Sequence, residues 1–187
     1  MAAGRGRLSV WLVDLDLMAS SQYAALNAEA GRYGELGPAL AASPDGSIFF
    51  TVEPPDAGAD GRITPAASYL TAHQVGELNW WVTRFRAEAL GGRQTVAISP
   101  SRDYWNALRK HADLIIVDCP SADRSDAALT VAPFMDQTVL VVSADEPDVK
   151  APALLRDALV ATGADVAGLF FNRAVVEEPP FLKAILP

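Results

Sequence analysis

The stretch Val10-Trp11-Leu12-Val13-Asp14-Leu15-Asp16-Leu17 joins a continuous apolar run to a pair of carboxylates. A second stretch of the same kind, Leu114-Ile115-Ile116-Val117-Asp118-Cys119-Pro120, follows much later in the chain. Strands that are buried on both faces of a parallel sheet are continuously apolar rather than alternating. The ligands of such sheets bind beyond the carboxyl ends of the strands. We therefore expect strands over Leu8 to Val13 and Leu114 to Val117, in a parallel sheet with an acidic edge.

Further apolar runs extend this pattern towards the C-terminus. Two more strands are predicted over Thr138 to Ser143 and Val166 to Phe171. The helical spacing of apolar residues predicts helices over Asp126 to Phe134 and Val149 to Thr162, with Gly163 as the stop of the second helix. The alternation of strands and helices in this half of the chain predicts a right-handed parallel α/β unit.

The middle of the chain is less regular, and four short elements are predicted in its first part. They are helices over Tyr23 to Gly31 and Gly34 to Ala42, a strand over Ser47 to Val52 and a surface loop over Glu53 to Pro65. The loop contains three prolines, two glycines and three acidic residues, a composition that is typical of an exposed connection.

Two further segments precede the second acidic strand. Apolar residues at helical spacing predict an amphipathic helix over Glu77 to Leu90, although Trp80 to Thr83 would also suit a strand. A second helix is predicted over Arg102 to His111, since Ser101 can serve as its N-cap and its aromatic residues share one face. The middle segment therefore keeps two interpretations, one helical and one extended.

Length and composition predict one domain. The chain has 187 residues, 50% of them hydrophobic, which is enough for one sizeable core and too few to make two probable. Its formal charge of −8 argues against nucleic acid as a partner, because nucleic-acid affinity depends mostly on Lys and Arg that neutralise phosphates. We therefore expect one α/β domain over residues 1–187 that binds no nucleic acid.

The single cysteine and the short apolar runs favour a cytoplasmic location. Cys119 cannot form an internal disulfide, which fits a reducing compartment. Asp118 beside it should raise the pKa of the thiol, which predicts an inert side chain. No apolar stretch approaches the roughly 20 residues needed to cross a bilayer, and the basic N-terminus lacks the apolar segment of a signal peptide.

Several short motifs occur in a characteristic order. Asp14-Leu15-Asp16 and Asp118-Cys119-Pro120 each end an apolar run, and Ser125-Asp126-Ala127, Ala132 to Val142 and Gly168 to Arg173 follow them. This order resembles the MinD/ParA-type deviant P-loop ATPases. Within that superfamily it is most similar to the bacterial tyrosine kinases of capsular and exopolysaccharide biosynthesis, the CpsD/CapB family. The similarity is densest in the C-terminal half and includes the first strand.

The resemblance implies a P-loop NTPase-like α/β fold, with a mostly parallel sheet flanked by helices on both faces. It implies that Asp14 and Asp16 serve Mg²⁺ and activate the attacking hydroxyl, that Asp118 holds Mg²⁺ through water, and that Asn172 contacts the adenine of ATP. Arg173 could stack on the base or face solvent. Carboxylates do suit Mg²⁺, but from the residues alone each Asp could instead end a strand or cap the next helix, and Asn172 could simply end a strand.

The phosphate-binding loop of this superfamily is missing from the chain. No G-x-x-x-x-G-K-[ST] occurs, and the lysines at 110, 150 and 183 have no glycine-rich neighbours. Backbone N–H groups and a lysine normally hold the phosphates in such loops, so we expect weak ATP binding or none. The tail also lacks the tyrosine cluster of the related kinases, so autophosphorylation there is not expected.

Two explanations of the missing loop stay open. Either a strand with its P-loop precedes Met1, so that the chain is N-terminally truncated relative to the family, or the protein is a degenerate relative; we favour the first. In the family's sheet the missing strand lies between the strand of Asp118 and the strand of Val139 to Val142. Its loss would leave two apolar strand edges, which we expect another polypeptide to cover.

The resemblance implies a regulator of capsular or exopolysaccharide synthesis or export. Such a protein would be cytoplasmic, either free or peripheral at the inner membrane. It would act through a membrane-embedded polysaccharide co-polymerase or export protein, as a monomer or as a homo-oligomer. Whether tyrosine-kinase or ATPase activity remains is open without the P-loop lysine. The alternative is a non-catalytic MinD/ParA-like localisation or scaffold protein. It would resemble the atypical ATPases of pilus assembly, whose Asp-Leu-Asp-Leu motif is close to Asp14 to Leu17.

Overall fold

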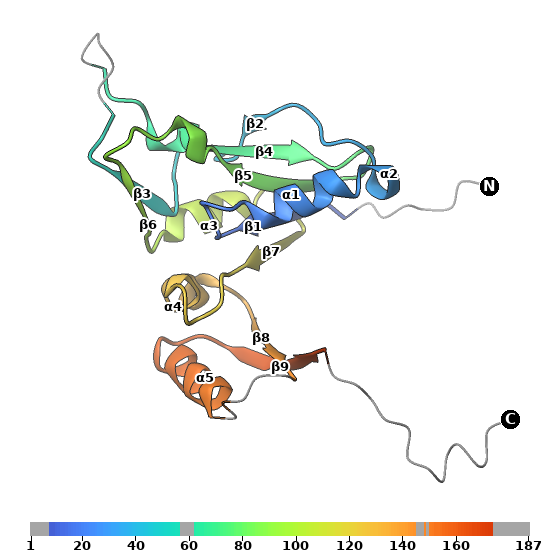
Figure 1. The fold of residues 1–187 in the computed structure, drawn as a ribbon, viewed down its shortest axis with the longest axis vertical. Coiled ribbons are helices and arrows are strands. Elements are labelled where there is room, and N and C mark those ends of the chain that lie inside the picture. The colour runs from blue at the N-terminus through green and yellow to red at the C-terminus, as the bar shows by residue number, and fades with distance from the viewer. Residues whose placement is uncertain (1–7, 57–61, 145–147, 149, 174–187) are drawn as a thin grey trace, which may run out of the picture. The chain divides into compact units, whose positions relative to one another are not determined.

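The computed structural model describes residues 8–56, 62–144, 148 and 150–173. The chain divides into two compact units, residues 1–134 and residues 135–187 (Figure 1). Helices and strands occur in both units, which makes the protein a mixed α/β protein as predicted. The single domain over the whole chain stays a prediction.

The first unit is built on a five-stranded sheet with the order β2-β4-β5-β1-β7. β1 (Val10–Asp14) lies between β5 (Trp80–Phe85) and β7 (Leu114–Asp118) and runs parallel to both. β4 (Leu70–Gln74) is antiparallel to β5, and β2 (Leu40–Ala41) is antiparallel to β4. The two predicted acidic strands are therefore confirmed as parallel neighbours, within a sheet that is mixed.

β5 forms where the apolar spacing favoured a helix over Glu77 to Leu90, so that prediction is wrong and the strand alternative is confirmed. β5 has ladder partners on both sides, β4 and β1, which satisfy its backbone groups. Its tryptophans, valine and phenylalanine suit a strand better than a helix. The 3₁₀ turn η2 (Ala87–Ala89) follows after β5 ends.

The predicted helix over Gly34 to Ala42 is also wrong. The helices end before it: α1 covers Ser21–Ala28 and α2 covers Ala30–Tyr33. Gly34 has φ 91°, and a Cβ placed there would lie 2.7 Å from the Cα of Gly76. The chain then pairs with the sheet, because the N–H of Gly37 donates to the carbonyl of Gln74 at 2.8 Å before β2 begins.

A small second sheet and a further helix also belong to the first unit. β3 (Phe50–Glu53) pairs antiparallel with β6 (Thr95–Ile98), and the 3₁₀ turn η1 (Ala66–Tyr69) precedes β4. α3 (Arg102–Leu108) begins at the predicted residue and ends three residues earlier than predicted. Ser101 is its N-cap as expected, since its Oγ accepts a hydrogen bond from the N–H of Tyr104 at 3.4 Å. The predicted strand at Ser47 to Val52 is thus confirmed, whereas β6 had not been predicted. Residues 57–61 of the predicted loop lie outside the described residues.

The C-terminal elements follow the sequence pattern closely. In the first unit, α4 (Ala127–Val131) and the 3₁₀ turn η3 (Ala132–Phe134) occupy the predicted helical segment. In the second unit, β8 (Thr138–Ser143) and β9 (Val166–Asn172) run parallel, joined by α5 (Ala151–Ala161). Gly163, with φ 89°, ends this helix as predicted. None of the helices in the described ranges has the length and hydropathy of a bilayer-spanning helix.

Candidate functional site

The sheet brings the three predicted carboxylates together. Asp14 and Asp118 are the last residues of the parallel strands β1 and β7 and lie opposite each other in the ladder. The pairing continues one step further, since the N–H of Leu15 donates to the carbonyl of Asp118 at 2.9 Å. Asp16 follows directly. The acidic edge that the sequence predicts is therefore present, and its three members come from two neighbouring strands.

Asp14 is held by donors from the chain that follows it. One carboxylate oxygen accepts the N–H of Gln22 at 2.8 Å and lies 3.4 Å from the hydroxyl of Ser21, while the other accepts the N–H of Asp16 at 2.9 Å. α1 begins at Ser21, so the bond from Gln22 satisfies a backbone donor that has no partner within the helix. Asp14 is only 3% exposed. In this structure it caps the next helix, the alternative that the residues alone left open.

Ser20 occupies the N-cap position of α1, but its side chain does not cap the helix. Ser20 has φ 45° and makes no side-chain cap bond. Its hydroxyl instead lies between the backbone groups of Phe85, accepting from the N–H at 3.3 Å and donating to the carbonyl at 3.4 Å. The N–H of Asp14 also donates to β5, at 3.0 Å from the Oγ1 of Thr83. The start of α1 and the end of β1 are thereby both fastened to β5.

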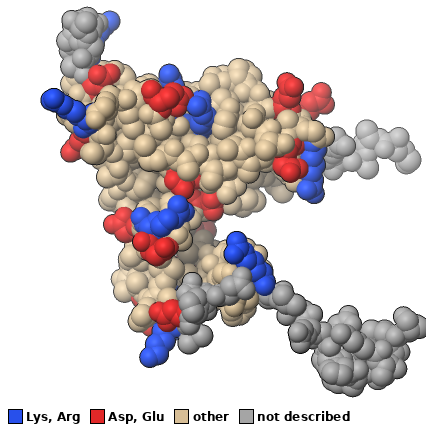
Figure 2. Space-filling view, viewed as in Figure 1, with Lys and Arg blue, Asp and Glu red and all other residues tan. Residues whose placement is uncertain are grey.

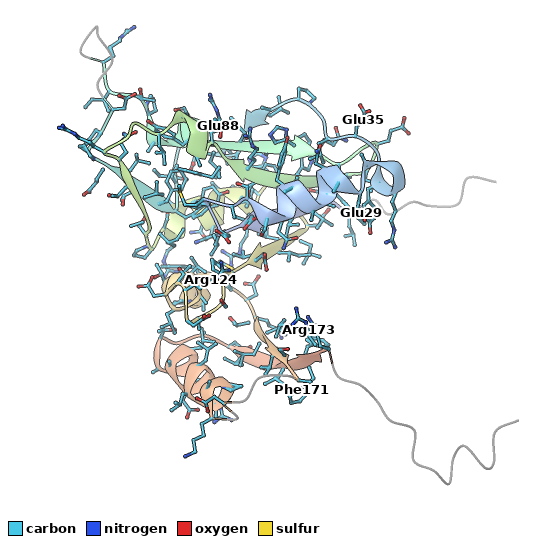
Figure 3. The ribbon with its side chains drawn as sticks, in the orientation of Figure 1. Glu29, Glu35, Glu88, Arg124, Phe171 and Arg173 are labelled. Carbon is cyan, nitrogen blue, oxygen red and sulfur yellow. The ribbon has the colours of Figure 1, made fainter. Side chains whose placement is uncertain are left out.

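Two residues that the sequence did not point to complete the cluster. The side-chain amide of Gln22 donates to Asp118 at 2.7 Å, so Gln22 connects Asp14 and Asp118 through its backbone and its side chain. Arg124 reaches Asp16 at 3.7 Å from the loop after β7 (Figure 3). No motif indicated either residue, because their position depends on how α1 and this loop pack against the sheet.

The surroundings of Asp14 disfavour the ionised form of its carboxyl group and so raise its pKa. Burial raises the pKa of Asp14, and the negative charges of Asp118 and Asp16 raise it further. The backbone hydrogen bonds from Gln22 and Asp16 act in the opposite direction but do not cancel the effect of burial. Among the residues that the structure describes, no three His, Cys, Asp or Glu side chains form a group that could hold a metal ion. The carboxylates are thus engaged by protein donors, and their magnesium role stays a prediction.

The two predicted nucleotide-binding residues lie in the second unit. Asn172 is the last residue of β9, and its side-chain oxygen accepts the N–H of Arg173 at 2.9 Å. The carbonyl of Asn172 accepts the N–H of Ala144 at 2.8 Å, which extends the β8–β9 pairing. Arg173 has φ 59° and is exposed at the end of the strand (Figure 3). Asn172 thus ends a strand, and contact of either residue with adenine stays a prediction.

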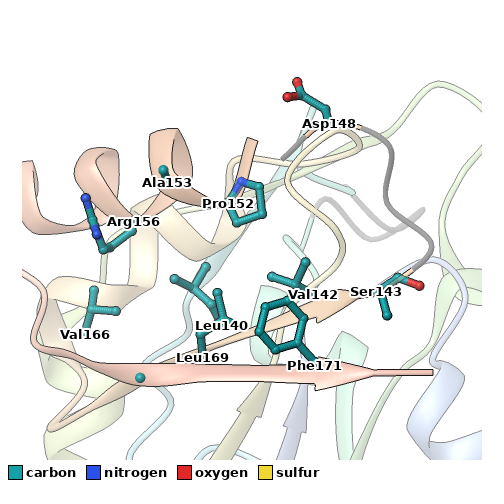
Figure 4. A pocket seen from close by; sticks show the side chains of 12 residues that line it. Leu140, Val142, Ser143, Asp148, Pro152, Ala153, Arg156, Val166, Leu169 and Phe171 are labelled. Atoms are coloured by element: carbon teal, nitrogen blue, oxygen red, sulfur yellow. The ribbon is translucent and has the colours of Figure 1, made fainter. Parts of the chain in front are cut away.

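A cavity of about 490 Å³ lies between α5 and the β8–β9 pair of the second unit (Figure 4). Apolar side chains form most of its lining, including Leu140 and Leu169 from the two strands. Arg156 also lines it, but its guanidinium contacts Asp157 at 2.7 Å. None of the five predicted site residues lines this cavity, which offers few of the convergent polar groups that orient a ligand.

The thiol of Cys119 is expected to react slowly in the folded protein. Burial raises its pKa to about 12, and the charge of Asp118 acts in the same direction. Since the thiolate is the nucleophile, iodoacetamide at pH 8 should label the folded chain far more slowly than the chain in concentrated urea. Mass spectrometry over time measures both rates. Equal rates would show that Cys119 is accessible and ionised in the folded protein.

The described site is a hydrogen-bonded cluster of three carboxylates that fixes the start of α1 on the sheet. On the face shown in Figure 2, acidic and basic side chains are interspersed over a mostly uncharged surface. The chain matches no protein-family model, no curated protein and no solved structure.

Proposed function

We propose that the chain is a regulator of capsular or exopolysaccharide synthesis or export, and that residues 1–187 act by binding a partner rather than by turning over ATP. The polysaccharide role rests on the order of motifs from Asp14 to Arg173, which resembles the bacterial tyrosine kinases of these pathways. The partner that this resemblance implies is a membrane-embedded co-polymerase or export protein. The chain would then act in the cytoplasm, at the inner membrane.

The observation that carries the non-catalytic part is the use of Asp14 as a helix cap. A catalytic carboxylate has to reach the proton that it abstracts or the metal that it serves. Asp14 is 3% exposed and accepts from three donors of its own chain. Asp118 accepts from Gln22. ATP would have to displace these donors, and residues 1–187 contain no P-loop lysine to offset the charge of its phosphates.

A P-loop NTPase-like, mostly parallel sheet with helices on both faces is part of the same proposal. It is supported by the parallel pairing of β1 with β7 and of β8 with β9. A non-catalytic localisation or scaffold protein of the MinD/ParA type is the second candidate, since the capping role of Asp14 supports it equally. Genes for glycosyltransferases and polysaccharide export beside this one would favour the first proposal, and genes for pilus assembly would favour the second.

Calorimetric titration with Mg-ATP tests the non-catalytic part. The chain 1–187 is expected to bind no more tightly than about 1 mM, which corresponds to about −4 kcal/mol. The Asp118→Asn variant serves as the control, because it alters the acidic edge while keeping a side-chain oxygen that can accept from Gln22. Micromolar binding that Asp118→Asn weakens would contradict the proposal.

Deletion of the gene tests the polysaccharide part separately. Surface polysaccharide is expected to fall or change in chain length, and complementation with wild type or with Asp118→Asn should restore it equally. Restoration by wild type alone would mean that the acidic edge has a direct role. An unchanged polysaccharide after deletion would reject the assignment to this pathway.

A further inference from the structure

The two edges of the five-stranded sheet differ in how well they are protected. Natural sheets protect their edges with very short strands, charges or prolines. One edge is β2, which has two residues, and the other is β7, with five. The sequence of β7 is Leu-Ile-Ile-Val-Asp, so it carries no charge before its last residue. Among the described strands, β7 pairs only with β1.

The free side of β7 presents regularly spaced backbone groups. The N–H of Leu114 donates to the carbonyl of Ser9 at 3.0 Å, and the carbonyl of Asp118 accepts from Leu15 at 2.9 Å. Residues of a parallel strand turn their N–H and C=O groups to alternate sides. The groups of Ile115 and Val117 therefore point away from β1, and a further strand could pair with them.

Apolar side chains accompany this open edge on one face of the sheet. Leu114 and Ile116 share that face and are 48% and 47% exposed. Leu114 stands beside Val10 in the ladder, and Val10 stands beside Trp80, which is 41% exposed. The exposed apolar surface thus continues across three strands and reaches the edge at β7.

We propose that β7 pairs antiparallel with β7 of a second copy, about a two-fold axis at Ile115. A two-fold axis brings the same edge to itself and closes the assembly as a dimer. Around Ile115 the outward N–H and C=O groups of the two copies meet in hydrogen-bonded pairs. Leu114 then lies opposite Ile116 of the second copy in a non-hydrogen-bonded pair, where side chains approach most closely.

A second copy fits this edge because the pairing opposes no like charges. With the axis at Ile115, Asp118 lies opposite Ala112 of the second copy and Asp113 lies opposite Val117. The chain has a formal charge of −8, so contacts between copies at other surfaces would more often bring acidic groups together. The central residues of β7 are uncharged, and each exposed side chain meets an apolar partner of suitable size.

Light scattering after size-exclusion chromatography of the chain 1–187 tests the proposal. At micromolar concentration the mass is expected to be twice 19.8 kDa. Leu114→Lys should halve the measured mass, because it places a solvated charge opposite Ile116 of the second copy. Leu40→Lys is the matched control: Leu40 is 49% exposed on β2 at the other edge, and its replacement should leave the dimer intact. Far-UV circular dichroism checks that both variants fold.

Disulfide formation tests the register. In a Cys119→Ala background, the pair Leu114→Cys and Ile116→Cys is expected to form a covalent dimer on mild oxidation, since the paired Cα atoms would lie about 4.5 Å apart. Leu40→Cys should form none. A monomeric wild type would overturn the proposal and indicate that the same chain, for instance β8, covers the edge. A dimer that Leu114→Lys leaves intact would overturn it as well, since another surface would then carry the contact.

Discussion

Replacing Trp105 with alanine is expected to destabilise the first unit by about 3–5 kcal/mol, the usual loss for a large aromatic residue in a packed core. Trp105 is 1% exposed, and its ring stacks on Phe49 at 5.3 Å and meets the ring of Tyr104 at 4.9 Å. Alanine would leave a cavity among these rings. Urea unfolding followed by circular dichroism measures the loss, with Trp80→Ala as the control because Trp80 is 41% exposed. Equal losses in the two variants would show that Trp105 does not anchor this core.

Phenylalanine at position 105 is expected to cost less than half as much. The indole Nε1 of Trp105 is buried and makes no hydrogen bond within the described part of the chain. A buried donor without a partner costs about 1–3 kcal/mol. Trp105→Phe removes that donor while keeping a ring against Phe49, so the two changes partly offset each other. If the phenylalanine variant lost as much as the alanine variant, the indole N–H would have a partner in solution.

Asp14→Ala is expected to destabilise the protein by about 2 kcal/mol, because it removes a helix cap and leaves buried backbone donors without an acceptor. Relief of the repulsion from Asp118 and Asp16 limits the loss. Asp16→Ala is the control, because the contact of Asp16 with Arg124 is 3.7 Å long and partly exposed, and such pairs contribute about 0–1 kcal/mol. Urea unfolding of both variants checks the difference. A larger loss in Asp16→Ala would contradict the capping role.

The pH dependence of the stability lost in Asp14→Ala provides a second test of the environment of Asp14. The pKa of Asp14 is raised in the folded state, so the folded protein binds this proton more tightly than the unfolded chain. The proton bound to Asp14 therefore stabilises the folded state. This contribution is fully present below the ordinary pKa of 3.8 and is lost as the pH rises through the folded-state pKa. The free-energy difference between wild type and Asp14→Ala should therefore be larger at acidic than at neutral pH. A difference that grows towards neutral pH would reverse the sign of the shift.

The sequence predicted correctly those helices and strands for which apolar pattern, spacing and stop residue all indicate the same structure. β8, α5 and β9 were predicted because apolar runs, helical spacing and Gly163 all indicate the same boundaries. β5 was ambiguous because Leu78, Trp81 and Phe85 also match a helical period, and only its pairing with β4 and β1 decides for the strand. β4 and β6 escaped prediction because both are short and contain polar residues.

The site was predictable in position and less so in role. That Asp14, Asp16 and Asp118 would meet followed from their place after two apolar strands. Whether Asp14 would be free or would cap a helix depended on the docking of α1. That docking relies on the left-handed Ser20 and its bonds to Phe85, contacts between residues far apart in sequence. The roles of Asn172 and Arg173 remain predictions from the resemblance.

The central place of β1 has a consequence for how the chain folds. β1 is synthesised long before its partners, since Asp14 bonds Thr83, 69 residues later, and Ser9 bonds Asp113, 104 residues later. Pairing over such separations costs loop-closure entropy and slows folding. During synthesis the apolar residues of β1 therefore have to wait for β5 and then β7. A strand with two unpaired edges favours aggregation, so this interval is the stage of folding at which the nascent chain is most exposed to it.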